Sequence, residues 1–476
     1  MTTEAPIAPA ATEQPPVRPA LHTMASLRRP EGRPFVRGLV LLTLVGAAVR
    51  LMDVLWWRPT TTRPGYHGYA LTGDSFYYHL QANSLAAGEW FVDPIRWFNT
   101  GEGVASAAHP PLYSTYLGLW STLGIDTVTG HRLASSLLGI AAVALIGLLG
   151  YRLAGPAAGL VAAGIAAVYP QLWINDGVLL SESIVVLAIA CALHAMYSFW
   201  QHSTLRNACV LGAVCGIAAL GRNELILLFA VVAIPLALRA RDIDWRARIR
   251  LAVVACLAGA VFVMPWALWN LTRFNEPTLT SSSLGSVLSA ANCDSVYYGS
   301  LIGFYDNCFQ GPWPTGDESE RDAVPRKQAI EYMKDHVTRL PVVVLARVGR
   351  VWGVFKPGQT TLFDWSIEHR GRAASWTGLF SYYLLLPFAG IGLVSLWRRR
   401  ISILPLVAGP LIVTFAAATT FGVTRYRAPA EVAIVLAAAV GMVATVGWLR
   451  GRRPSLATTG ITTGESPTRP GTLASP

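Results

Sequence analysis

Long apolar runs recur along the 476 residues, and they constrain the fold more than any other feature of this sequence. A helix needs about 20 consecutive apolar residues to cross the hydrocarbon core of a bilayer. Within hydrocarbon its backbone polar groups must bond inside the segment, which favours helices over isolated strands. The sequence therefore predicts an all-α polytopic membrane protein with about ten transmembrane helices. The runs cover residues 36–57, 131–150, 155–172, 178–199, 206–221, 224–239, 251–270, 374–396, 402–421 and 430–449.

The composition agrees with this interpretation, because 53% of the residues are hydrophobic and only 14% are charged. The formal net charge of +11 raises the question of nucleic-acid binding. However, the positive charge is gathered in short clusters beside the apolar runs, where basic loops favour the cytoplasmic side. We therefore expect a multi-pass protein of the plasma membrane with both termini cytoplasmic and no nucleic-acid partner. The clusters lie at residues 28–37, 239–250, 398–400 and 450–453.

The same topology divides the chain into five regions. Both ends are rich in Pro, Ala and Thr and predict disordered cytoplasmic tails, since they cannot bury enough apolar surface to fold. Interfacial helices are expected in the first outer loop, where run 111–124 is too short to span, and again at 341–355. The regions are a tail at 1–35, a transmembrane module at 36–270 that includes the outer loop 58–130, an extracytoplasmic region at 271–373, transmembrane helices at 374–449, and a tail at 450–476.

Two of the six cysteines, Cys293 and Cys308, lie in the extracytoplasmic region and predict a disulfide, because that compartment is oxidising. The other four lie in apolar runs. No CxxC or His-rich ligand spacing occurs, so a structural zinc site is not expected. No cofactor is predicted and no residue is assigned to a metal, although a divalent metal ion is left open.

Nucleotide-binding motifs are absent from the sequence: it has neither GxxxxGK[ST] nor a GxGxxG after a strand. No cytoplasmic segment is long enough to hold a nucleotide-binding domain. ATP-driven transport and direct use of a nucleotide-sugar are therefore not expected. Any chemistry should take place in the membrane or on its outer face, with a substrate that already carries its energy.

Ionisable residues at the outer ends of the predicted spans are the candidates for function, because charge in hydrocarbon is costly. Each also has a structural interpretation: a helix N-cap for Asp74, a first-turn acid for Glu182, a turn pair or headgroup anchors for the arginines. Arg50 and Asp53, one turn apart, are expected to form an interfacial pair. Together, however, carboxylates suit removal of a hydroxyl proton, and arginines suit a lipid-linked phosphate. The candidates are Asp74, His109, Glu182, Arg222, Glu224, Arg425 and Arg427.

Six motifs in order give the chain a resemblance to the GT-C glycosyltransferases, over about residues 36–449. The most similar branch is that of the protein O-mannosyltransferases and the lipid A aminoarabinose transferases. Three departures are a Ser after Asp74, a His at 109 and a Glu at 182. The motifs are Asp74–His79 with His109-Pro110-Pro111-Leu112, Arg132–Gly139, Tyr169-Pro170 leading to Ser181-Glu182, Ala219–Arg222, Pro265-Trp266 with Asn270, and Arg425–Pro429.

The resemblance implies transfer of a sugar, with inversion, from a polyprenyl phosphate to an acceptor hydroxyl on the outer face of the membrane. It implies that Asp74 is the catalytic base or acceptor-binding group and that Glu182 supports it. Arg222, Arg425 and Arg427 are the candidates for the lipid phosphate. The predicted substrate-binding set further contains His109, Glu224, Tyr77 and Tyr78.

The sequence thus predicts a hexosyl- or pentosyltransferase of cell-envelope glycan or glycoprotein synthesis, with a glycan, protein or lipid acceptor. A non-catalytic transporter or flippase for a lipid-linked glycan is the first alternative, since it would use the same arginines and need no base. Transporters place polar groups through the midplane and often contain inverted repeats, and neither is visible here. A structural subunit of an envelope-building complex is the second alternative.

Overall fold

The computed structural model describes residues 21–28, 32–58, 71, 73–312 and 314–451. Most of the two expected tails, and residues 59–70 of the first outer loop, lie outside the described residues. Within the described part the regular elements are all helices, and the one β-bridge joins Val92 to Ala105. The all-α membrane fold is therefore confirmed.

The predicted apolar runs all fall in helices, but only six of the helices described are long and apolar enough to span a membrane alone. A seventh candidate span is the bent pair α7 (Pro156–Val168) and α8 (Pro170–Val178), with 42° between its halves. The remaining runs form shorter apolar helices: α10 (Leu205–Ala219), the segment from η4 (Asn223–Leu227) through η5 (Phe229–Ala233) to α11 (Ile234–Leu238), and α19 (Leu404–Thr419). The six long spans are α1 with η3 (Arg33–Trp57), α6 (Val128–Ala154), α9 (Glu182–Gln201), α12 (Trp245–Arg273), α18 (Arg372–Arg398) and η6 with α20 (Thr424–Gly451).

The centre of the bundle is α20 (Ala428–Gly451), which is buried continuously from Ala428 to Gly441. It packs closely against α18, because a Cβ on Gly392 or Gly441 would meet the backbone of the other helix. The same close approach joins α10 to α12 at Gly216 and Gly259. Without a hydrophobic driving force between helices in lipid, small residues at the contact allow the backbones to pack.

The break between α7 and α8 leaves a short helix inside the bundle. Pro170 has no backbone N–H and disfavours a helical residue before it, and Tyr169 is accordingly extended, with φ −71° and ψ 115°. Leu179, with φ 70°, ends α8 in a left-handed conformation. The chain turns there, so that α9 begins at Glu182, next to the end of α8.

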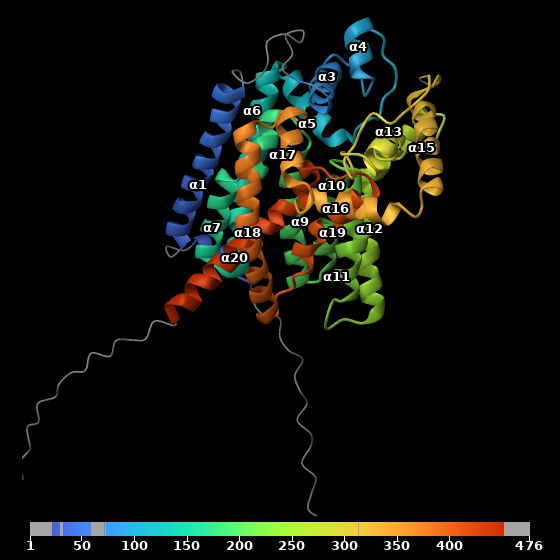
Figure 1. The fold of residues 1–476 in the computed structure, drawn as a ribbon. Coiled ribbons are helices and arrows are strands. Elements are labelled where there is room, and N and C mark those ends of the chain that lie inside the picture. The colour runs from blue at the N-terminus through green and yellow to red at the C-terminus, as the bar shows by residue number, and fades with distance from the viewer. Residues whose placement is uncertain (1–20, 29–31, 59–70, 72, 313, 452–476) are drawn as a thin grey trace, which may run out of the picture.

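Several short helices gather at one end and along one side of the bundle (Figure 1). α13 (Leu284–Ala290) packs against α15 (Glu318–Asp335), and α3 (Asp74–Ala86) packs against α5 (Pro111–Thr122). α5 is the short helix expected of the non-spanning run at 111–124. α16 keeps an exposed apolar face at Leu345 while Arg347 and Arg350 turn inward and donate to backbone carbonyls. The short helices are α3 (Asp74–Ala86), α4 (Pro94–Thr100), α5 (Pro111–Thr122), α13 (Leu284–Ala290), α14 (Asp294–Tyr297), α15 (Glu318–Asp335), α16 (Leu340–Val351) and α17 (Pro357–Ser366).

Two expectations about individual contacts have different outcomes. Cys293, just before α14, and Cys308, in the loop after it, are joined in a disulfide. The predicted interfacial pair of Arg50 and Asp53 is wrong. Arg50 instead donates to Asp176 of α8 at 2.7 Å, and Asp53 accepts from Arg58 at 2.8 Å, with all four side chains buried. Each of these acids thus gains a charged partner inside the bundle instead of reaching the interface.

Candidate functional site

A cavity of about 860 Å³ lies where several helix ends meet. Its walls come from segments far apart in the sequence: the start of α3, the start of α9, the turn from α10 to η4, the turn before α18, and η6 (Thr424–Arg427). Its lining combines charged and apolar side chains, and the apolar ones are called the apolar wall. The apolar wall includes Val178, Leu180, Ile226, Leu227, Leu284, Val287, Phe415 and Phe421.

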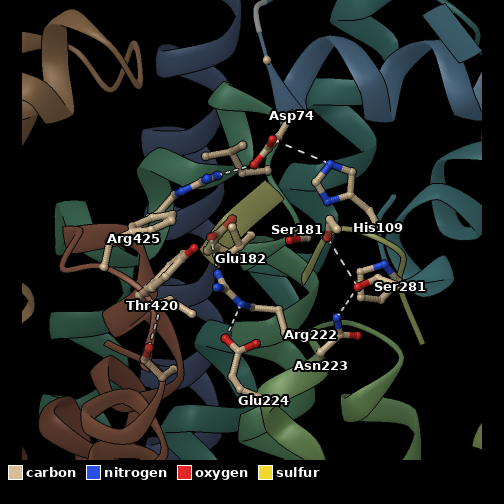
Figure 2. Close-up of a pocket in the computed structure, with 18 of the residues that line it drawn as sticks. Asp74, His109, Ser181, Glu182, Arg222, Asn223, Glu224, Ser281, Thr420 and Arg425 are labelled. Carbon is tan, nitrogen blue, oxygen red and sulfur yellow. Dashed lines mark hydrogen bonds and ion pairs between the residues drawn. The ribbon is translucent and has the colours of Figure 1, made fainter. Parts of the chain in front are cut away.

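Asp74 is held in this cavity by two cationic or ionisable side chains (Figure 2). Its Oδ2 accepts from Nη1 of Arg425 at 2.6 Å, and its Oδ1 lies 3.7 Å from Nε2 of His109. The N-cap of α3 is Gly73, whose φ of 55° suits glycine, so the N-cap interpretation of Asp74 does not hold. Burial would raise the pKa of Asp74, but Arg425 and His109 hold that pKa well below its usual range.

Arg222 forms the second charged group of the cavity. Its Nη1 donates to Oε1 of Glu182 at 2.6 Å, and its Nε donates to Oε1 of Glu224 at 2.6 Å. The ring of Tyr426 lies between the two arginines, 4.5 Å from the guanidinium carbon of Arg222 and 5.9 Å from that of Arg425. The two charged groups therefore meet at one aromatic side chain.

The two predicted tyrosines have different surroundings. Tyr78 lines the cavity, whereas the buried Tyr77 does not. The hydroxyl of Tyr77 donates to Gln81 at 3.1 Å, and its ring packs against His109 with 4.7 Å between the ring centroids. Burial raises the pKa of Tyr78. Both tyrosines thus pack around the imidazole of His109, but only Tyr78 faces the space that a substrate could enter.

Arg427, a predicted phosphate ligand, does not line the cavity. Its Nε donates to Glu431 at 2.5 Å, its Nη1 donates to the carbonyl of Val351 at 3.1 Å, and its guanidinium lies 3.7 Å from the ring of Tyr382. The side chain is 1% exposed. The reason is its position at the junction of η6 and α20, where a residue two positions after Arg425 points into the bundle.

Several lining residues were not predicted from the sequence. The main one is Glu368, whose Oε1 lies 3.6 Å from Nε of Arg425 and accepts from the hydroxyl of Tyr305 at 3.3 Å. It lies in the long outer region, where acids are too common to single one out. Its place just before the apolar run at 374–396 was the available signal, because the other candidate acids also stand at span ends. Asn223, Ser281, Thr419, Thr420 and Tyr426 also line the cavity.

A metal would need several ligands at one point. Among the described residues no group of three or more His, Cys, Asp and Glu is placed to hold one ion. The carboxylates of the cavity are instead divided between the two arginines.

Comparison with known proteins gives a family match for part of the chain. Residues 108–269 match the family described as dolichyl-phosphate-mannose-protein mannosyltransferase. This stretch contains His109, Glu182, Arg222 and Glu224, whereas Asp74 and Arg425 lie outside it. No curated protein sequence matches the chain.

Solved structures show the same fold. The archaeal oligosaccharyltransferase AglB from Archaeoglobus fulgidus, in complex with an inhibitory peptide and a dolichol-phosphate, is 15% identical with a TM-score of 0.53. The match covers 92% of this chain and 53% of that one, so the chain spans about half the length of AglB. The oligosaccharyltransferase from A. fulgidus in its apo form gives 14% identity, a TM-score of 0.51, and coverages of 88% and 51%.

ArnT from Cupriavidus metallidurans bound to undecaprenyl phosphate is 16% identical, with a TM-score of 0.42 and coverages of 87% and 80%. At these identities the structural likeness concerns the fold. The likeness to the two oligosaccharyltransferase structures, together with the family match over residues 108–269, confirms the predicted resemblance to the GT-C superfamily. The chain is accordingly a multi-pass membrane protein with a GT-C-like fold.

Proposed function

We propose that this protein is a membrane glycosyltransferase that moves a sugar from a polyprenyl-phosphate-linked donor to an acceptor hydroxyl. The observation that carries the proposal is the cavity itself, which combines two arginines, four carboxylates and an apolar wall. Arginine binds phosphate oxygens bidentately, and a carboxylate can accept a hydroxyl proton. The apolar wall suits the isoprenoid end of the same donor.

The proposed reaction is a single displacement with inversion. The acceptor oxygen bonds to the anomeric carbon as the bond from that carbon to the phosphate oxygen breaks. Arg222 and Arg425 stabilise the charge of the departing lipid phosphate. A carboxylate of the cavity takes the acceptor proton, and Asp74 binds the acceptor or serves as this base.

The proposed side is extracytoplasmic, in the plasma membrane, with both termini in the cytoplasm. The charged residues of the cavity support one common side, because they lie at the start of α3, α9 and α20, the end of α10, and just before α18. The sugar would be a hexose or pentose, and the acceptor a glycan, protein or lipid of the cell envelope. The same clustering at helix ends disfavours a flippase, which needs polar groups through the midplane.

The test uses the full chain in nanodiscs, with undecaprenyl phosphate for binding and labelled undecaprenyl-phosphate sugars for transfer. A hydrogen bond to a charged group contributes about 1.5–3 kcal/mol, so Arg425→Met should weaken lipid-phosphate binding roughly 10- to 100-fold. Arg222→Met should weaken lipid-phosphate binding by a similar factor. Arg206→Met, an exposed arginine at the start of α10, is the control and should bind like wild type. Lipid binding without transfer of any sugar, together with movement of the lipid across the bilayer, would indicate a transporter instead.

A further inference from the structure

Two carboxylates share Arg425, but they are bound to it unequally. Oδ2 of Asp74 accepts a hydrogen bond from Nη1 of Arg425 at 2.6 Å, which is the length of a strong charged hydrogen bond. Glu368 lies 3.6 Å from the same guanidinium, and its other close contact is the Tyr305 hydroxyl at 3.3 Å. Asp74 is therefore committed to the arginine, whereas Glu368 is only loosely held by its neighbours.

Glu368 is nevertheless fixed in place, because the turn that carries it is anchored on both sides. The carbonyl of His369 accepts from Nη1 of Arg58 at 3.3 Å. Nη2 of Arg370 donates to Gln171 and Asn175 of α8, both at 3.2 Å. The Glu368 side chain lines the cavity and is 12% exposed. The anchors hold the backbone and leave the carboxylate facing the space for substrate.

A general base works best when its pKa lies near the working pH, because it must be both deprotonated and able to take a proton. Burial raises the pKa of Glu368, and Asp74 and Glu182 act in the same direction against Arg425. The pKa of Asp74 moves the other way. A lipid phosphate that binds Arg425 would weaken its hold on Glu368 and further increase the proton affinity of this glutamate.

We propose that Glu368 is the catalytic base of the cavity and that Asp74 orients Arg425 and binds the acceptor hydroxyl. The inference rests on the proposed function and assigns the roles within that site. The acceptor hydroxyl gives its proton to Glu368, and its oxygen forms the bond to the anomeric carbon. The bond from that carbon to the phosphate oxygen breaks, and the electron pair leaves with the polyprenyl phosphate.

The charged and titratable groups that face Glu368 come from every segment around it. They are Arg425 on η6, Asp74 on α3, Glu182 on α9, Asp364 on α17 and Tyr305 on the loop after α14. Arg425 favours the carboxylate form, and the three acids favour the protonated form. The sign of the pH dependence follows, since a base works only when deprotonated. Transfer should fall as the pH drops through the pKa of Glu368.

The experiment measures transfer from an undecaprenyl-phosphate sugar by the full chain against pH. Glu368→Gln should lower kcat by at least about 100-fold, the lower end of what general-base catalysis contributes, and should remove the acidic limb of the profile. Asp74→Asn should mainly raise KM and keep the limb. Glu331→Gln, an exposed glutamate on α15, is the matched control and should behave like wild type. The apparent Tm reports whether each variant is folded.

Two outcomes would overturn the inference. One is a Glu368→Gln protein that keeps the acidic limb, and the other is a limb that disappears in Asp74→Asn, which would make Asp74 the base. If Glu368→Gln does not fold, Glu368→Asp is measured in its place. This variant should transfer sugar more slowly and keep an acidic limb in its pH profile. A pH profile of Glu368→Asp without an acidic limb would reject Glu368 as the base. A wild-type protein that transfers no sugar would instead contradict the proposed function, so the two failures are distinguishable.

Discussion

The buried ion pair of Arg427 and Glu431 leads to a prediction that separates structural from ligand-binding arginines. Arg427→Met would leave Glu431, whose side chain is 2% exposed, with only the Tyr169 hydroxyl, which donates to it at 2.8 Å. Removing one partner of a buried ion pair typically costs about 3–5 kcal/mol, because the remaining charge is uncompensated. At about 2 °C per kcal/mol for a large chain, the apparent Tm should fall by roughly 6–10 °C.

The double variant Arg427→Met with Glu431→Gln isolates the cause. It removes the stranded charge while the glutamine oxygen still accepts from Tyr169, so at least half of the lost Tm should return. Arg450→Met, at the exposed far end of the same helix, is the control and should leave the Tm unchanged. Thermal unfolding in one detergent measures all four proteins.

The same samples test whether Arg427 binds the donor. Because Arg427 lies outside the cavity, folded Arg427→Met protein should bind undecaprenyl phosphate as tightly as wild type. An Arg427→Met protein that keeps the wild-type Tm and loses lipid-phosphate binding would instead make Arg427 a ligand of the donor. A double variant no more stable than the single one would show that the charge of Glu431 is not the cause of the lower Tm.

Two further predictions concern stability. A Cβ at Gly139 would collide with the side chains of Asp176 and Arg50, so Gly139→Ala should displace their ion pair and lower the apparent Tm. Gly447→Ala is the control and should leave the Tm unchanged, because Gly447 has open space around it. Reduction of the disulfide between Cys293 and Cys308, which are 15 residues apart, should destabilise the outer region by about 3 kcal/mol on a chain-entropy argument; proteolysis of that region with and without reductant measures it, and equal rates would contradict the expectation.

The membrane fold could be predicted from the sequence because spanning hydrocarbon imposes length, apolar composition and helical backbone at once. Residues at span ends could be chosen for the same reason, since charge is tolerated there. Six of the residues chosen in this way line one cavity: Asp74, His109, Glu182, Arg222, Glu224 and Arg425. Their chemical roles stay predictions.

Contacts between distant segments could not be predicted in this way. Arg50 and Asp53 are neighbours on a helix, and spacing alone therefore pairs them. In the folded chain Arg50 bonds to Asp176, 126 residues away, because a buried arginine without a charged partner is strongly destabilising. Glu368 was missed for a related reason. Glu368 becomes a candidate only because it lies beside Arg425, which in turn bonds to Asp74. Asp74 and Arg425 are 351 residues apart in the sequence.

The short helix α8 has a consequence for how the protein is made. Gln171 and Asn175 of this helix bond to Arg370, which is 199 and 195 residues further along the chain. At roughly 5–20 residues per second, a ribosome needs on the order of 10–40 s to add that length. During this interval the amides of α8 lack their eventual partner, while the ion pair to Arg50 can already form. Until then the side-chain amides of α8 need other hydrogen-bond partners, such as water or the insertion machinery. The cavity itself is complete only after the last third of the chain has been synthesised, because Glu368 and Arg425 lie there.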